Sequence, residues 1–351
     1  MGLKEYVIRR MFTGFITLVI VIAANFIIFR LPSFITGIDP ATLYGMSRLM
    51  GEAGSGRGET DPTRIIDQII DFKRRWDLPS LAAPIGVWFD HFIKYLINML
   101  TFNFGRSMTA PAINQEVVDV LLARLPYTLY LMIPATILSI IIGIALGVKI
   151  GSKPGSKLDL TMMTIAMALY ALPVFWLQII LLMVFASYLG WWPVGGGISS
   201  TKYGFADPLL FFVDIMYMFT LPIISLVIGG FAGWMLLMRN SLVDVMTEDY
   251  IITARAKGLD ERVVLYKHAF RNAVLPVVTA VILALAGVWT GAIITERVFS
   301  IPGVGNLFLL AVLNDNYPLA EMLFYFVALT VIIANIIADI SYAILDPRVK
   351  Y

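Results

Sequence analysis

The chain has 351 residues, of which 59% are hydrophobic and 14% charged, and its formal net charge is +2. Because soluble domains carry roughly 25% charged residues, this composition indicates a polytopic membrane protein. The small net charge gives no support for a nucleic-acid partner, and the absence of cysteine excludes disulfides, thiolate metal sites and a cysteine nucleophile.

Six apolar runs are long enough to cross a bilayer, whose core of about 30 Å needs roughly 20 apolar residues in a helix. We predict spans at about 9–30, 125–149, 159–189, 217–238, 274–295 and 322–345. The first run is longer than the apolar core of a cleaved signal peptide, so it is expected to be retained. The third is long enough to tilt, and Pro173 is expected to kink it.

The basic residues of the connections predict how these spans are oriented. Most of them lie in the connections on the side of the amino terminus, whereas the two short connections on the other side hold only Lys202 and Arg297. Because Lys and Arg accumulate in cytoplasmic loops, we expect both termini to be cytoplasmic.

The first extracytoplasmic loop, residues 31–124, contains two different segments. Residues 40–75 are polar and Gly-rich ("GEAGSGRGETDP") and indicate a solvated insertion. An amphipathic helix is predicted at about 85–104, with an apolar face of Ile85, Phe89, Phe92, Ile93, Leu96 and Leu100 opposite Asp90, Lys94 and Asn98. This helix could lie at the outer interface, cap the bundle, or simply pack against other helices.

Three spans contain pairs of glycines one turn apart: Gly143/Gly147, Gly229/Gly233 and Gly287/Gly291. Such pairs let helix backbones approach closely in lipid, so they predict tight helix packing. Asp339, with Asn335 one turn earlier, is the main ionisable group within the spans, and we interpret it as bonding to a neighbouring helix.

The sequence contains no recognisable catalytic, cofactor or metal site. The dipeptide Gly-Lys is absent, which excludes a Walker A loop, and no Gly-x-Ser-x-Gly or His-Glu-x-x-His motif occurs. His91 and His268 lie in different segments and do not form a metal-binding pair. If the protein moves a solute uphill, we expect another subunit to supply the energy.

The segment "DYIITARAKGLDERVVLYKHAFRNAVLPV" (Asp249–Val277) is a strongly charged interruption of the apolar part of the chain. Residues 251–257 favour a helix, and Gly258 suits the left-handed position that ends one. Asp260 is expected to cap a following short helix, and Pro276 falls in the first turn of the fifth span. The pattern predicts a rigid basic element that docks on acidic lipid or on a protein groove.

This segment closely resembles the cytoplasmic loop of the inner-membrane permeases of ABC importers of the dipeptide/oligopeptide/nickel family. The resemblance covers nearly the whole chain, including "FNFGRS" (102–107), "LPYTL" (125–129), "ALPVFW" (171–176), "ERVFSIPGVG" (296–305), "NDNYP" (314–318) and "DPR" (346–348). Ile252, Thr253 and Ala254 replace the Glu-Ala-Ala of the wider motif, and Asn316 stands where an aspartate is usual. The 40–75 insertion is longer than in the familiar peptide permeases.

The resemblance implies an all-α membrane protein with six transmembrane helices of the type I ABC importer permease kind, in one domain over residues 1–351. It implies a cytoplasmic coupling-helix loop at 240–273 that docks on an ATPase subunit. The expected docking residues are Ala254, Gly258, Leu259, Asp260, Glu261, Val263 and His268. The expected translocation path includes Pro173, Trp176 and Gln178.

The resemblance also implies the partners. These are a second homologous permease, two nucleotide-binding ATPase subunits that carry ATP and magnesium, an extracellular solute-binding protein and the lipid of a prokaryotic inner membrane. The chain itself is expected to hold no cofactor and to be no enzyme.

The cargo and two other classes of function remain open. Peptides or oligosaccharides are the expected cargo, and Trp176, Tyr188, Trp191 and Trp192 either form an interfacial belt or stack on sugar rings. An ATP-independent secondary transporter or channel is the alternative, and it would need coupling-ion sites or broken helices paired in an inverted repeat. A membrane enzyme is disfavoured because no catalytic constellation is visible.

Overall fold

The computed structural model describes residues 3–36, 63, 67, 70, 85–107, 109–195 and 208–345. Helices dominate these residues and no strand forms among them, apart from an isolated bridge between Arg106 and Glu116. The predicted all-α architecture is confirmed. Most of the predicted insertion at 40–75, and the motif at 346–348, lie outside the described residues.

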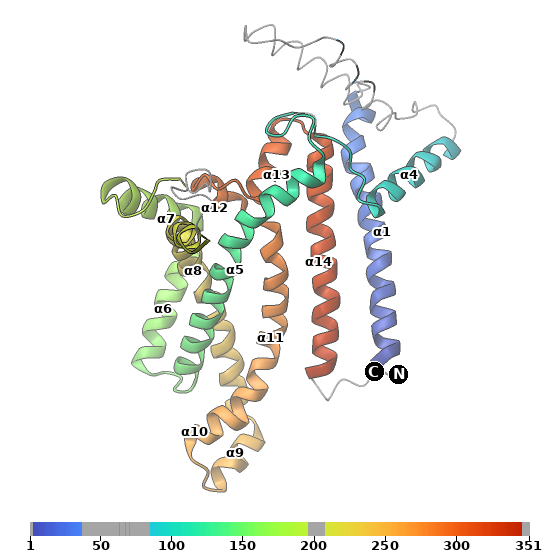
Figure 1. Cartoon of the computed structure of the whole chain (residues 1–351). Coiled ribbons are helices and arrows are strands. Elements are labelled where there is room, and N and C mark those ends of the chain that lie inside the picture. Colours follow the sequence, from blue (N-terminus) through green and yellow to red (C-terminus); the bar gives the residue numbers. More distant parts are fainter. Residues whose placement is uncertain are drawn as a thin grey trace. The chain divides into compact units, whose positions relative to one another are not determined.

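The helices in chain order are α1 (Leu3–Thr36), α4 (Ile85–Leu100), α5 (Val117–Gly151), α6 (Lys157–Ala171), α7 (Val174–Leu181), η1 (Leu182–Tyr188), α8 (Pro208–Met246), α9 (Asp249–Ala256), α10 (Glu261–Val263), η4 (Val264–Ala269), α11 (Phe270–Gly287), η5 (Val288–Thr290), α12 (Ile293–Val298), α13 (Val304–Leu313) and α14 (Tyr317–Leu345) (Figure 1).

Five of the six predicted spans are confirmed as helical segments long and apolar enough to cross a membrane. They are Glu5–Arg30, Val117–Gly151, Leu209–Met246, Glu261–Val298 and Tyr317–Ser341. The predicted amphipathic helix is also present as α4, which ends at Leu100, before the predicted limit.

The third predicted span is divided into two helical parts, with a bend much sharper than the predicted kink. It consists of α6 and the continuous α7–η1 segment, which meet at 92°. Leu172 is extended (φ −83°, ψ 130°) because the proline that follows disfavours a helical conformation at the preceding residue. Pro173 then begins α7 as its N-cap, so it breaks the span at the predicted place but far more sharply than a kink.

The chain forms two compact units. One contains Met1–Met11, Arg124–Asn306 and Thr330–Tyr351, and the other contains Phe12–Ala123 and Leu307–Leu329. Among the described residues, the first unit has three apolar clusters, centred on Phe219, Met238 and Met235. The second has one such cluster, which joins α1, α4 and α14 around Ile22, Tyr95, Met99 and Tyr325.

The predicted close packing at glycine pairs is confirmed for one pair and half of another. A Cβ atom at Gly147 would lie 2.7 Å from the Met235 carbonyl oxygen, and Gly143 approaches Trp234 and Phe231 on the same helix, α8. Gly229 packs on Val174, whereas Gly233 has open space beside it.

The third glycine pair, Gly287/Gly291, does not form one packed helix face as predicted, although a Cβ atom at Gly291 would lie 2.7 Å from the Gly305 backbone nitrogen of α13. A Cβ atom at Gly287 would have no neighbour within 4 Å, and Gly291 has a φ of 77° and follows the end of η5. The interpretation of Asp339 is confirmed, since its carboxylate lies 3.1 Å from the Arg10 guanidinium and joins α14 to α1.

Candidate functional site

The charged segment forms a hairpin of helices, residues 249–272, at the end shared by α8 and α11 (Figure 1). The predicted turn is confirmed: α9 ends at Ala256, and Gly258 has a φ of 76°. A Cβ atom at Gly258 would have no neighbour within 4 Å. Glycine is therefore favoured there by backbone conformation and not by lack of space.

Polar bonds close the 249–272 hairpin on its outer side. The Asp260 carboxylate accepts a hydrogen bond of 2.7 Å from the Arg262 backbone N–H, which confirms the predicted cap. Arg255 Nε donates to Glu261 Oε1 at 2.8 Å across the turn. These side chains are 40% and 67% exposed, so the ion pair orients the two helices but adds little stability.

The inner side of the 249–272 hairpin is a packed apolar core. Ile251, Ala254, Val264 and Ala269 are buried in one cluster with residues of α5, α8 and α11. Ser241 of α8 also donates a 2.6 Å hydrogen bond to the Ala273 carbonyl oxygen of α11. Buried side chains at this density transmit displacement, so the hairpin is rigidly attached to α5, α8 and α11.

The outer side of the 249–272 hairpin carries most of the predicted docking residues. Gly258, Leu259, Asp260, Glu261 and Val263 are exposed, and His268 is half-buried. The expectation for Ala254 is corrected, because this residue is only 6% exposed and its methyl group packs in the core of the chain itself.

Sequence reasoning missed two exposed apolar residues on this hairpin. Tyr266 is 61% exposed and Ile252 is 56% exposed, beside Leu259 (39%) and Val263 (38%). Val263 and Tyr266 are three residues apart in helix, a spacing that places them on one face and offered a signal in the sequence. Several exposed apolar side chains on one charged element are typical of a protein contact.

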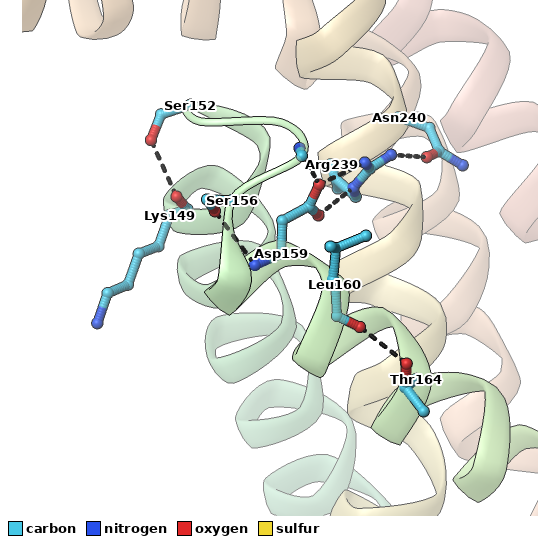
Figure 2. Close-up of polar contacts among 9 residues, drawn as sticks. Lys149, Ser152, Ser156, Asp159, Leu160, Thr164, Arg239 and Asn240 are labelled. Atoms are coloured by element: carbon cyan, nitrogen blue, oxygen red, sulfur yellow. Dashed lines mark hydrogen bonds and ion pairs between the residues drawn. The ribbon is translucent and has the colours of Figure 1, made fainter.

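A buried ion pair ties α6 to α8 (Figure 2). Asp159 accepts two hydrogen bonds from Arg239, at 2.6 Å from Nε and 2.7 Å from a terminal nitrogen, and a third of 2.8 Å from the Gly155 backbone N–H. Ser156 caps α6 by accepting a bond from the Asp159 backbone N–H. Figure 2 shows Asn240 on the other side of the guanidinium, where its side-chain oxygen accepts a bond of 3.2 Å from Arg239.

This pair fixes the α5–α6 turn to the helix that leads into the 249–272 hairpin. The Asp159 side chain is fully buried and that of Arg239 is 15% exposed. The Ser-x-x-Asp spacing of Ser156 and Asp159 is a capping-box pattern, so the cap was detectable in the sequence. The pairing of Asp159 with Arg239 was not detectable, because no local sequence pattern connects the two residues.

The predicted translocation residues have different environments. Pro173 lies at the break between α6 and α7, and Trp176 is 51% exposed. The prediction for Gln178 is corrected, because this side chain is fully buried and donates a 2.8 Å hydrogen bond to the Thr295 hydroxyl. Gln178 therefore joins α7 to α12.

Next to Thr295, the carboxylate of Glu296 is enclosed by backbone and glycine. It accepts hydrogen bonds from the Thr128 hydroxyl (2.9 Å) and from the Asn306 backbone N–H at the start of α13 (2.7 Å). A Cβ atom at Gly303 would lie 2.5–2.6 Å from this carboxyl group. The helix N-terminus favours the negative charge, and the arrangement fixes α5, α12 and α13 to one another.

Within the described parts of the chain, no group of three or more His, Asp or Glu side chains could hold a metal ion. The polar clusters described above for the first unit join helices to one another.

Comparison with known proteins identifies the family. The family described as "Binding-protein-dependent transport system inner membrane component" matches residues 139–351. The oligopeptide transport system permease protein AppB of Bacillus subtilis is 37% identical over 261 residues, which cover 74% of this chain and 80% of that protein. The di/tripeptide transport system permease protein DppB of Pseudomonas aeruginosa is 34% identical, with coverages of 75% and 81%.

A third relative covers more of the chain. The peptidoglycan transport system permease protein YejB of Agrobacterium fabrum is 31% identical over 318 residues, which cover 88% of this chain and 83% of that protein. With five helical segments able to span a membrane and a sixth that is broken, these matches show a multi-pass membrane protein. The chain belongs to the family of binding-protein-dependent transport system inner membrane components and is a permease subunit of an ABC importer.

Proposed function

We propose that this permease carries short peptides and is driven through its 249–272 hairpin, on which an ATPase subunit docks. The exposure of four apolar side chains on this hairpin, those of Ile252, Leu259, Val263 and Tyr266, is the observation that supports this proposal most directly. Lipid would require only positive charge, whereas exposed apolar side chains on a rigid hairpin favour a protein groove.

The proposed assembly has two permeases, this chain and a homologue, two ATPase subunits that bind ATP and magnesium, and an extracellular solute-binding protein. ATP binding favours a closed arrangement of the ATPases and so shifts the population of permease conformations. The hairpin would carry this shift to α5, α8 and α11, with which it shares a core. The predicted topology places the hairpin and both termini in the cytoplasm.

The relatives support peptides as cargo, because the names of two of them specify oligopeptides and di- or tripeptides. Oligosaccharides are the second candidate. The distinguishing experiment is a thermal-shift screen of the co-purified solute-binding protein against peptides of two to eight residues and against oligosaccharides of matched length. Stabilisation by oligosaccharides alone would exclude peptide cargo.

An ATP-independent secondary transporter would pair broken helices in an inverted repeat. The described residues contain one bent helix pair, α6 with α7–η1, and a second such pair would be needed. Uptake into inside-out and right-side-out vesicles that persists on a proton or sodium gradient without ATP would overturn the ATP-driven proposal.

The docking role is tested by Gly258→Val. A non-glycine residue in the left-handed conformation costs about 1–2 kcal/mol, and more when it is β-branched. Because no atom lies near a Cβ at this position, the substitution changes the backbone of the turn without a clash. We expect the variant to assemble in the membrane but to transport less solute per ATP hydrolysed.

Gly190→Val is the matched control. Gly190 also has a positive φ (65°) with no atom within 4 Å of a Cβ, and it lies outside the 249–272 hairpin. If both valine variants lower transport per ATP equally, the effect comes from general strain and the docking role is refuted. The same conclusion follows if Gly258→Val transports normally.

A further inference from the structure

Helix α4 exposes more apolar surface than its packing explains. One face packs inward, where Tyr95 and Met99 are 6% and 3% exposed. A second face is polar and exposed, with Asp90, Lys94 and Asn98. A third face, between these two, is apolar yet exposed: Phe89 is 63%, Ile97 54% and Leu100 39% exposed.

The packed face of α4 shows how deep the helix lies along α1. The Phe26 ring meets the Phe92 and Tyr95 rings at centroid distances of 5.5 and 5.2 Å, and Met99 shares a buried cluster with Ile22. The apolar span of α1 ends at Arg30. From Arg30 back to Ile22 the helix rises about 12 Å, so the C-terminal end of α4 lies well inside the end of that span.

Helix α14 gives an independent measure of the same depth. Arg30 forms a buried ion pair with Glu321 of α14 (3.2 Å), which brings the two helices into register. The residues that follow α4 pack deeper than this pair, since the Phe102 and Phe104 rings lie 6.0 and 5.5 Å from the ring of Tyr325. Tyr325 lies about 6 Å along the helix from Glu321.

The chain then returns toward the start of α14. The Asn316 amide donates hydrogen bonds to the Ser107 hydroxyl (2.7 Å) and the Thr109 carbonyl oxygen (3.1 Å). An aspartate at position 316 could not donate these bonds. Helix α4 therefore runs along α1 away from the Arg30 end, and the segment after it returns along α14 toward the start of that helix. Figure 1 shows the oblique course of α4 against α1.

The turn at the deepest point satisfies its own backbone groups, as an apolar environment requires. The Asn103 N–H bonds to the Asn98 carbonyl oxygen (2.9 Å), and the Phe102 N–H bonds to that of Met99 (3.3 Å). This pair of hydrogen bonds is the pattern that ends a helix at a residue in the left-handed conformation. Phe102, with a φ of 56° and 52% exposure, occupies that position.

We infer that α4 is a re-entrant interfacial helix, inserted obliquely into the leaflet on the Arg30 side of the membrane, whose stripe of Phe89, Ile97 and Leu100 contacts lipid acyl chains. The depth of about 6–12 Å overlaps the roughly 5–10 Å at which amphipathic helices are embedded at the boundary between headgroups and acyl chains. The polar face with Asp90, Lys94 and Asn98 is directed to the headgroups and water. This lipid contact is independent of the cargo and of what docks on the 249–272 hairpin.

The absence of native cysteine allows a direct test with single-cysteine variants of the full chain in the assembled importer. Ile97→Cys, Leu100→Cys and Asn98→Cys are spin-labelled in nanodiscs of phosphatidylethanolamine and phosphatidylglycerol. Collision with oxygen and with a water-soluble nickel chelate then reports the depth of each label. Ile27→Cys and Ile20→Cys on α1, which are 59% and 61% exposed, calibrate shallow and deep positions of the span.

The labels at Ile97 and Leu100 are expected to give depths between those at Ile27 and Ile20. Their access to the nickel chelate should be severalfold lower than that of the label at Asn98 on the polar face. Nickel access equal to that at Asn98 would place the stripe in water. Low access to both reagents would place a protein partner over the stripe, and either result overturns the inference. If a variant does not assemble, Phe89→Cys reports on the same stripe near its other end.

Discussion

Replacing Asp159 with asparagine is expected to detach the α5–α6 turn from α8. The substitution keeps the size of the side chain but leaves the Arg239 guanidinium without the carboxylate that accepts two of its hydrogen bonds. Removing one partner of a buried ion pair costs about 3–5 kcal/mol. Because Arg239 is 15% exposed and water reaches part of it, we expect a cost near the lower limit, about 3 kcal/mol. At 1.4 kcal/mol per tenfold change, the detached population rises roughly 100-fold.

Hydrogen exchange followed by mass spectrometry measures this population. The Gly155 amide proton is bonded to the Asp159 carboxylate (2.8 Å), so its exchange, and that of the first turn of α6, reports the opening of the clamp. Asn240→Ala is the matched control, because it removes a neutral neighbour of the same guanidinium and leaves the charge pair intact. Exchange that accelerates equally in both variants, or in neither, would refute the assignment of Asp159 and Arg239 as the clamp.

Two further substitutions test the other buried polar groups. Gly303→Ala places a Cβ atom 2.5–2.6 Å from the Glu296 carboxyl group, so the carboxylate must move away from Thr128 and Asn306. We expect a lower thermal midpoint in detergent. Gly195→Ala is the control: the nearest neighbour of its Cβ atom is an ordinary 3.8 Å away, so the thermal midpoint should not change. Arg30→Met leaves the Glu321 carboxylate without its ion-pair partner at 7% side-chain exposure, which should destabilise the α1–α14 contact by about 3–5 kcal/mol. Adding Glu321→Gln to Arg30→Met should restore much of the thermal midpoint. A double variant no more stable than Arg30→Met would argue against the ion pair.

The parts of the fold that follow from local chemistry are predictable from the sequence. Gly258 ends α9 and Asp260 caps α10 because both effects depend only on nearby backbone. The positions of the spans follow from apolar length alone. In the same way, the break at Pro173 is predicted at the correct place, since the proline acts on the residue before it.

The errors concern residues whose role is set by distant segments. The sequence favours Ala254 for the docking surface and Gln178 for the translocation path, yet both are buried. Their burial depends on α8 and α12, which no pattern around either residue specifies. The Asp159–Arg239 pair joins residues 80 positions apart. From the sequence alone, Asp159 is explained as part of a helix cap and Arg239 as a basic residue near the membrane surface, so neither residue indicates the ion pair.

The sharp angle between α6 and α7 has a cause of the same long-range kind. Helix α8 holds the pair at two points: Arg239 binds Asp159 of α6, and Gly229 packs on Val174 of α7, where a Cβ would lie 3.1 Å from that side chain. Along α8 these anchors are about 15 Å apart, whereas an uninterrupted helix would rise about 22 Å from residue 159 to residue 174. A straight helix running along α8 would carry residue 174 about 7 Å beyond Gly229. Pro173 determines where the chain turns, and the contacts with α8 on both sides of the break, together with the Gln178–Thr295 bond to α12, hold the two parts in place.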